Sequence, residues 1–285
     1  NGAAELIKAL METLPGSLGV TRPTFEEYPN RREKENLVTF IPKNSDYRYT
    51  AKDLMDFFGK NHADNILLIN PDNPSGNFIP IDDVIALAAW CQNQNIRLIV
   101  DESFVDFSNG YENNSLLHDT ILEAYPTMVV MKSISKSYGV PGIRLGILCS
   151  ADTALIAKMK KMVSIWNINS FAEYFMQIFT KYEKDYKRAC EKFIAEREDF
   201  EIKLKEISFL RVMPSQANYF LCEILPPKNA NQLVLTMLKK YNILMRDCSD
   251  KQGLDGKQYM RIAVRCHEDN ARLIAVFREL DVEKK

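Results

Sequence analysis

One segment of the sequence gathers anion-binding side chains around a single lysine. Residues 133–146 read Ser-Ile-Ser-Lys-Ser-Tyr-Gly-Val-Pro-Gly-Ile-Arg-Leu-Gly and follow a short apolar run. Backbone amides and serine hydroxyls can surround a phosphate, and Arg144 adds a planar guanidinium that is always charged. Nearby positive charge lowers the pKa of an amine, so we expect Lys136 to act as a nucleophile toward an aldehyde.

Two polar positions upstream are suited to the same site. Asp101 follows the apolar run Ile96 to Val100, which places a carboxylate at the carboxyl edge of a strand, where open α/β sheets bind ligands. The turn at 70–76, Asn-Pro-Asp-Asn-Pro-Ser-Gly, presents the Asn73 amide to the same crevice. Taken singly, each residue is more often structural than catalytic, so their shared order and spacing carry the prediction.

The elements that must position these residues alternate between strand and helix. In the first half, apolar runs predict strands at 36–41, 66–69, 96–100, 128–131 and 143–148. Between them, Ile81, Val84, Leu87, Ala88 and Cys91 recur on one helical face. Such alternation favours a mostly parallel α/β sheet that is covered on both sides.

The second half predicts a long helix followed by a small α+β unit. Residues 182–207 are densely charged but keep an apolar helical stripe. Beyond them we expect strands at 211–212, 219–222, 243–245 and 259–264, with helices near 231–241 and 268–280. The predicted division is a large domain at 1–170, a connecting helix at 171–207 and a small C-terminal domain at 208–285.

Together these motifs resemble the class I/II aminotransferases, which are pyridoxal-phosphate-dependent enzymes of fold type I. Within that superfamily the chain looks most like the branch of histidinol-phosphate aminotransferase and threonine-phosphate decarboxylase. The resemblance runs essentially end to end and includes residues 2–5, 23–25, the Asn73 turn, 101–102, Lys136, 215–220 and 261–265. It implies a three-layer large domain with a mostly parallel sheet and a smaller C-terminal α+β domain.

The resemblance also implies roles for individual residues. Lys136 would hold pyridoxal 5'-phosphate as a Schiff base and move protons at the substrate, and Asp101 would pair with the pyridine nitrogen. Asn73 would donate to the phenolic oxygen of the ring. The remaining cofactor contacts would be a stacking Phe25 and a phosphate cup of Ala3, Ala4, Ser133, Ser135 and Arg144.

Substrate contacts follow from the same resemblance. Arg261 matches the family's arginine for the substrate carboxylate, and Arg265 lies four residues on, where a strand would direct it to the same face. Tyr28, Asn167 and Asn169 are candidates for the substrate pocket, although packing or helix capping explains these three residues equally well.

The chain departs from the family pattern at two points. Phe104 occupies a position where a tyrosine commonly donates to the phenolic oxygen, so Asn73 must act there alone. That hydrogen bond is worth about 0.5–1.5 kcal/mol, which tunes the cofactor without abolishing it. We also expect the N-terminal arm, which in relatives completes the neighbouring subunit's site, to be missing.

Three functions fit these residues. The first is an aminotransferase acting on an amino acid or a phosphorylated amino compound. The second is a decarboxylase of an O-phospho-amino acid such as phosphoserine or phosphothreonine. The Arg261 and Arg265 pair and the similarity of residues 246–265 to the decarboxylase branch favour it, although the same groups serve both reactions. The third is a non-catalytic ligand-sensing domain of a larger protein, against which the complete lysine site argues.

Composition excludes several other classes. The formal net charge of -1 gives no electrostatic reason to expect nucleic acid or an anionic membrane as a partner. The six cysteines form no C-x-x-C pair and the three histidines are scattered, so we expect no metal. No apolar run is long enough for a membrane span. We therefore expect a cytoplasmic protein and, from the family, a homodimer.

Overall fold

The computed structural model describes residues 1–254 and 256–282 and contains two sheets. The first has six strands in the order β2-β1-β3-β4-β5-β6. Its strands are β1 (Leu18–Thr21), β2 (Leu37–Phe40), β3 (Asn65–Ile69), β4 (Arg97–Asp101), β5 (Met128–Ser133) and β6 (Gly146–Cys149). Neighbouring strands are parallel except for β5 with β6. The predicted mostly parallel sheet is confirmed.

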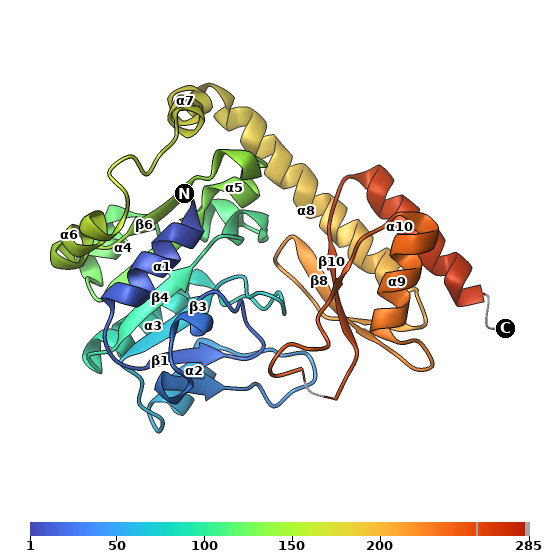
Figure 1. Ribbon diagram of the computed structural model, residues 1–285, viewed down its shortest axis with the longest axis horizontal. Coiled ribbons are helices and arrows are strands. Elements are labelled where there is room, and N and C mark those ends of the chain that lie inside the picture. Colours follow the sequence, from blue (N-terminus) through green and yellow to red (C-terminus); the bar gives the residue numbers. More distant parts are fainter. Residues whose placement is uncertain (255, 283–285) are drawn as a thin grey trace.

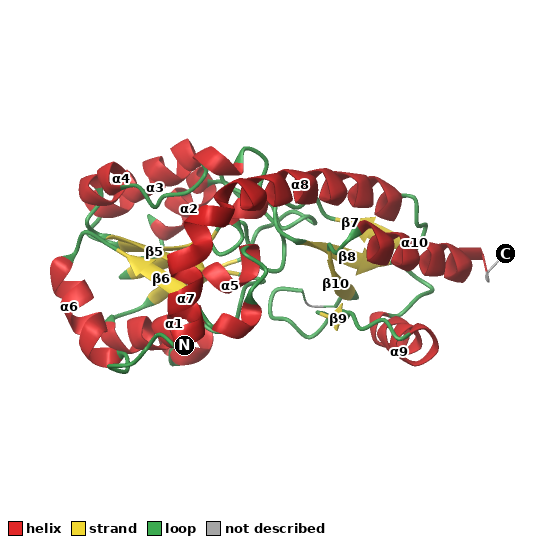
Figure 2. Cartoon of the chain, turned by 90° about the horizontal axis from the view of Figure 1, so that it is seen from above, coloured by secondary structure: helices red, strands yellow, loops and turns green. Residues whose placement is uncertain are grey.

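Helices cover both faces of this sheet, giving three layers (Figure 2). One face carries α2 (Ala51–Phe58), α3 (Ile81–Asn93) and α4 (Asp119–Ala124), and the other carries α1 (Ala3–Thr13) and α6 (Thr153–Met162). The apolar stripe of α3 packs into the first core, whereas Leu10 of α1 and Met159 of α6 belong to the second. Strand β3 is buried along its whole length because it lies between both cores.

The second sheet is antiparallel and smaller. Its order is β7-β8-β10-β9, with β7 (Leu210–Val212), β8 (Tyr219–Ile224), β9 (Arg246–Asp247) and β10 (Tyr259–Ala263). Helices α9 (Ala230–Tyr241) and α10 (His267–Val282) complete this unit. Phe220, Met260 and Phe277 lie in their shared core, so the predicted α+β unit is present.

Helix α8 (Glu183–Lys205) runs from the first sheet's unit along the second (Figure 1). The expected single helix at 171–207 is in fact α7 (Ser170–Phe179), a 3-10 turn at Thr180–Tyr182 and then α8. The buried side chains of α8 include Phe200 and Leu204, which pack into the core of the second sheet's unit. Most charged residues of α8 face the solvent. No helix among the described residues is both long and apolar enough to cross a membrane.

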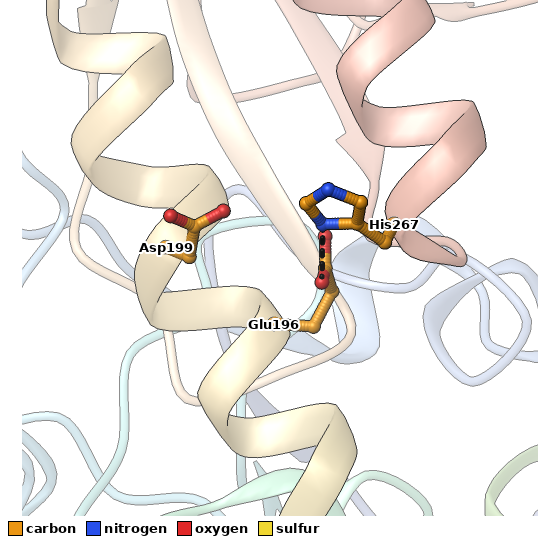
Figure 3. Close-up of side chains that lie close together, drawn as sticks. All are labelled: Glu196, Asp199 and His267. Atoms are coloured by element: carbon orange, nitrogen blue, oxygen red, sulfur yellow. Dashed lines mark hydrogen bonds and ion pairs between the residues drawn. The ribbon is translucent and has the colours of Figure 1, made fainter.

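A polar cluster ties α10 to α8 (Figure 3). Ligand-type atoms of Glu196, Asp199 and His267 lie within 4.8 Å of one another. Glu196 accepts from the Asn270 amide at 2.9 Å and lies 3.2 Å from His267 Nδ1, while Asp199 pairs with Lys203 at 2.5 Å. Because both carboxylates are already engaged by the protein, the cluster acts as a link between the helices.

One strand escaped the sequence prediction. Strand β1 is four residues long and contains Gly19, which interrupts the apolar pattern. The glycine is needed because a Cβ there would lie 2.5 Å from a ring carbon of Phe58. A short strand with a steric demand for glycine gives a weak pattern, yet it occupies an inner position of the sheet.

Two other strands begin later than predicted. The expected strand at 143–148 starts only at Gly146, because residues 141–143 form a 3-10 turn and Arg144 adopts φ 54°. The expected strand at 243–245 is displaced to Arg246–Asp247, since Asn242 ends α9 with φ 54° and the chain must then turn outward. In both cases the turn includes apolar residues, and their apolar pattern resembles that of a strand.

Candidate active site

A cavity of about 460 Å³ lies beside the carboxyl ends of β4 and β5. It is lined by residues from the start of α1, the loop after β1, the end of β4 and the segment after β5. The predicted cofactor residues on its wall are Ala3, Ala4, Phe25, Asp101, Ser133, Ser135, Lys136 and Arg144. Segments that are far apart in the sequence therefore meet at the predicted sheet edge.

Lys136 projects into this cavity from the short helix α5 (Ile134–Ser137). Its Nζ lies 4.1 Å from the centroid of the Phe104 ring and 5.6 Å from that of Phe25. Desolvation by the surrounding protein lowers the pKa of Lys136 although the side chain remains open to solvent; Asp101 opposes this and Arg261 adds to it. The expected lowering is present, but its first cause is burial, and the cation that helps is Arg261.

Asp101 is buried and both of its carboxylate oxygens accept hydrogen bonds. The amide of Ser103 donates to Oδ1 at 3.0 Å, and the Tyr28 hydroxyl donates to Oδ2 at 2.9 Å. Tyr28 has no exposed surface and is not on the wall of the cavity, so its suggested contact with a substrate stays a prediction. Its ring is part of the core beneath the sheet edge, and only its hydroxyl reaches the site.

Asn73 and Arg261 link the first unit to the second sheet, although neither residue is on the wall of the cavity of about 460 Å³. Arg261 of β10 donates from Nη1 to Asn73 Oδ1 at 2.8 Å, and its guanidinium carbon lies 4.9 Å from the Tyr219 ring centroid. With its amide oxygen engaged by Arg261, Asn73 has its NH2 group for donation to another molecule. Arg261 is thus oriented by two neighbours beside the lysine whose pKa it lowers.

The start of α1 and the turn around Arg144 form a cup suited to a phosphate. Gly2 precedes the helix with φ 75°, and a Cβ there would meet Arg144 Nη2 at 3.2 Å. A Cβ on Gly146 would lie 2.4 Å from the Ala3 nitrogen. Ser135 holds the turn by bonding both backbone groups of Leu145. A helix start beside a guanidinium is a natural anion site, and the glycines keep it open.

The remaining predicted substrate residues lie elsewhere. Asn169 caps α7 by accepting from the Ala172 amide at 3.0 Å, so the capping explanation fits it. Asn167 lies in the segment before that helix, where its carbonyl accepts from the chain's first amine. Arg265 is beyond the end of β10, largely exposed, and paired with Asp269 at 2.6 Å. It does line a cavity of about 610 Å³ together with Arg261.

Three residues of these cavities received no individual role from the sequence, although residues 246–265 resembled the decarboxylase branch. Ser103 and Asn218 line the lysine cavity, and Arg246 lines the larger one. Arg246 is the cross-strand partner of Arg261 between β9 and β10. The position of Ser103, two residues after Asp101, was a usable signal, but pairing Arg246 with Arg261 required the register of the second sheet.

A lysine amine near a buried carboxylate, below an aromatic ring and next to an anion cup, defines a pyridoxal-phosphate-dependent enzyme on this fold. The residues present fit the cofactor at each end: the cup suits the phosphate, Lys136 the aldehyde and Asp101 the ring nitrogen. A sequence profile of the family described as aminotransferase class I and II matches residues 1–277. The chain belongs to this family.

Individual relatives agree with the predicted branch. The L-serine phosphate decarboxylase of Campylobacter jejuni is 32% identical over 95% of this chain and 70% of its own length. The histidinol-phosphate aminotransferase of Clostridium novyi is 26% identical over 96% of this chain and 73% of its length. The solved structure of a decarboxylase from Sulfurospirillum multivorans superposes with a TM-score of 0.88 at 29% identity, covering 100% of this chain and 80% of that one.

The chain is shorter than these relatives. It spans 46% of the length of one curated relative from Sinorhizobium fredii and 70% of the Campylobacter enzyme. Threonine-phosphate decarboxylases are among the further matches, so the resemblance to this branch is confirmed.

Proposed function

We propose that this protein removes CO₂ from an O-phosphorylated amino acid with the aid of pyridoxal phosphate. The similarity to L-serine phosphate decarboxylases carries the proposal, because it extends over 95% of the chain at 32% identity in one organism and over the whole chain at 30% in another. The sequence alone ranked transamination first. These relatives favour the alternative that the sequence had left open.

The charge distribution supports a substrate with two anionic groups. Arg246 and Arg261 face each other across β9 and β10, and the cavity of about 610 Å³ between these strands and α10 also contains Arg265 and Arg272. One guanidinium suffices for a carboxylate, whereas a phosphate ester adds a second anion that needs its own partner. Arg261, whose charge acts on Lys136, suits the carboxylate, and Arg246 suits the phosphate ester.

The cofactor would be held by residues already described. The α1 amides and Arg144 would bind its phosphate, Phe25 would cover the ring, and Asp101 would keep the ring nitrogen protonated. When bound, pyridoxal phosphate supplies an aldehyde for the amine and a ring that takes up the electron pair released at Cα.

Reaction choice depends on how the protein orients the substrate. A carboxylate held by Arg261 against the Asn73 side keeps the bond from Cα to that carboxylate in a fixed direction relative to the ring. When CO₂ leaves, Cα must receive a proton, and the amine of Lys136 is the group placed to deliver it. The lowered pKa of Lys136 favours the neutral amine, which can take up a proton and give it to Cα.

The proposal is tested by incubating the cofactor-loaded protein with phosphoserine, phosphothreonine and histidinol phosphate. We expect CO₂ and the corresponding phosphorylated amine from one of the first two, with no accumulation of pyridoxamine phosphate. Arg246→Ala should reduce kcat/KM for the phosphorylated substrate, whereas Arg278→Ala, on an exposed pair with Glu206, serves as the matched control. Formation of pyridoxamine phosphate without CO₂ would instead establish the aminotransferase.

The aminotransferase remains the second candidate because of one observation. The histidinol-phosphate aminotransferase of Clostridium novyi matches 96% of the chain, and its substrate also combines an amine with a phosphate. The same incubation distinguishes both enzymes from a non-catalytic sensing domain, which would bind the cofactor and turn over none of the three compounds.

We also propose that the protein is a homodimer. The segment from the end of α6 through α7 exposes large apolar side chains: Ile165 and Trp166 are each 87% exposed and Phe171 is 79% exposed. The segment also touches the cup, since Asn169 donates to the Ile143 carbonyl at 2.8 Å. An apolar surface of this kind marks an interaction site, and a second copy there would lie beside the active site.

Sedimentation measurements test the assembly. We expect the parent protein to sediment as a dimer and Trp166→Glu to dissociate into monomers that bind the cofactor more weakly. Ile202→Glu, which changes an apolar residue that is 65% exposed on α8, is the matched control and should remain dimeric. A monomeric parent protein would contradict the proposal.

A further inference from the structure

Beneath the candidate active site, one buried phenol contacts the carboxylate assigned to the ring nitrogen. Tyr28 has 0% exposed surface, and its ring meets Phe25 edge-on with 6.5 Å between centroids. Its hydroxyl donates to Asp101 Oδ2 at 2.9 Å. Phe25 and Tyr28 therefore form one unit in which the first residue faces the cavity and the second supports the carboxylate from below.

Each oxygen of the Asp101 carboxylate accepts one hydrogen bond from the protein. Oδ1 accepts from the Ser103 amide and Oδ2 from Tyr28. Strand neighbours leave little freedom: Asp101 is paired in register with Ile69 on β3 and Met131 on β5. A hydrogen bond to a carboxylate stabilises the anion and makes it a weaker base.

On this basis, and on the assumption that the proposed cofactor chemistry is correct, we infer that Tyr28 is a positioning residue that sets the basicity and direction of Asp101. With the phenol in place, the proton shared between Asp101 and the cofactor's ring nitrogen resides on the nitrogen. Without it, the carboxylate becomes the stronger base and draws the proton to itself. Tyr28 thereby controls how well the ring accepts electrons.

The phenol is suited to act as a permanent donor. Burial, and then the neighbouring Asp101 charge, raise the pKa of Tyr28 well above its usual value. The hydroxyl consequently stays protonated at every pH at which the enzyme would work. A residue that titrated in this range would lose its donor function, whereas Tyr28 cannot.

The experiment measures the ¹⁵N chemical shift of ¹⁵N-labelled pyridoxal phosphate bound to the protein, together with the dissociation constant of the cofactor. In Tyr28→Phe we expect the shift to move toward that of a neutral pyridine, with weaker cofactor binding by about tenfold to a hundredfold, as for loss of a hydrogen bond to a charged group. Tyr259→Phe is the control, since it removes a buried hydroxyl bonded to Tyr47 instead of to a carboxylate.

A second substitution keeps the inference testable if Tyr28→Phe does not fold. Replacement of Tyr28 with 3-fluorotyrosine retains the ring and makes the phenol a stronger donor. The ¹⁵N shift should then move in the opposite direction, toward the fully protonated ring. If neither substitution moves the shift, Tyr28 is a packing residue and the inference is wrong; a parent protein that binds no cofactor would instead contradict the proposed function.

Discussion

Two lysines of the same segment, the buried Lys132 and the solvent-exposed Lys136, have opposite electrostatic surroundings. Lys132, within β5, bonds Asp106 at 2.9 Å and lies 3.9 Å from Glu102. Lys136, one turn further along the chain, makes no ion pair with any described carboxylate and instead faces the Phe104 and Phe25 rings. Burial alone lowers the pKa of both lysines, but the charges of Asp106 and Glu102 outweigh it at Lys132 and raise the pKa there.

The difference shows how one strand end can serve both stability and chemistry. A buried ammonium with two carboxylates stays charged and holds the structure together. An ammonium that is partly desolvated and has no carboxylate partner is pushed toward the neutral amine, which is the nucleophilic form. A lowered pKa without a salt bridge therefore favours Lys136 as the functional lysine, whereas Lys132 is buried and paired.

Lys136→Ala should give the largest effect. Loss of the amine removes both the covalent link to the cofactor and the proton carrier, so we expect a fall in kcat of at least about a thousandfold. Visible absorbance of the bound cofactor and CO₂ release are the measurements. Normal turnover in this variant would assign the chemistry to another residue and remove the contrast between the two lysines.

Lys132→Met should act on stability. It leaves Asp106 and Glu102 buried without a cation, which costs about 3–5 kcal/mol in the free energy of unfolding. Denaturant unfolding measures this quantity, and Lys52→Met, which breaks the exposed Lys52–Asp56 pair, should leave it unchanged. A loss at Lys132 no larger than that of the control would mean that its ion pairs do not hold the sheet edge.

A third buried charge extends the comparison to a carboxylate. Desolvation raises the pKa of Asp72 from 3.8 to about 6, and its bonds from Ser75 only partly oppose this. Since the folded state binds the proton more tightly than the unfolded chain, the free energy of unfolding should fall as pH rises from 3.8 to about 6. The full contribution is about 2–3 kcal/mol.

Asp72→Asn should flatten this pH dependence. Denaturant unfolding at intervals between pH 4 and pH 7 measures it, and Asp56→Asn on the exposed face of α2 should retain the parent's slope. An identical slope in Asp72→Asn and the parent would show that Asp72 is not the group responsible.

Much of the scaffold could be predicted because burial imposes strong patterns. The strands beside the site are short apolar runs, and the sequence predicted them at 96–100 and 128–131, whereas they end at Asp101 and Ser133. Strand β1 could not be predicted, because Gly19 is required by its contact with the Phe58 ring, which is remote in sequence. The domain division at 170 and 207 remains a prediction.

The candidate site shows the same limit. Lys136, Asp101 and Arg144 carry recognisable chemistry in recognisable surroundings, so type and spacing sufficed to nominate them. The contact of Tyr28 with Asp101 could not be predicted from the sequence, since it depends on how the loop after β1 folds. The segment that begins at Arg246 resembled the decarboxylase branch, but a substrate contact for Arg246 could be inferred only from its register with Arg261.

The contact between Gly146 and Ala3 has a consequence for how the molecule loosens. The backbone of β6 at Gly146 lies directly against the backbone of α1 at Ala3, and no side chain lies between them. If β6 and the start of α1 move slightly apart, the α1 amides lose the arrangement that binds an anion while the hydrophobic cores are still packed. Affinity for inorganic phosphate should therefore vanish at denaturant concentrations where the circular dichroism of the helices is still intact.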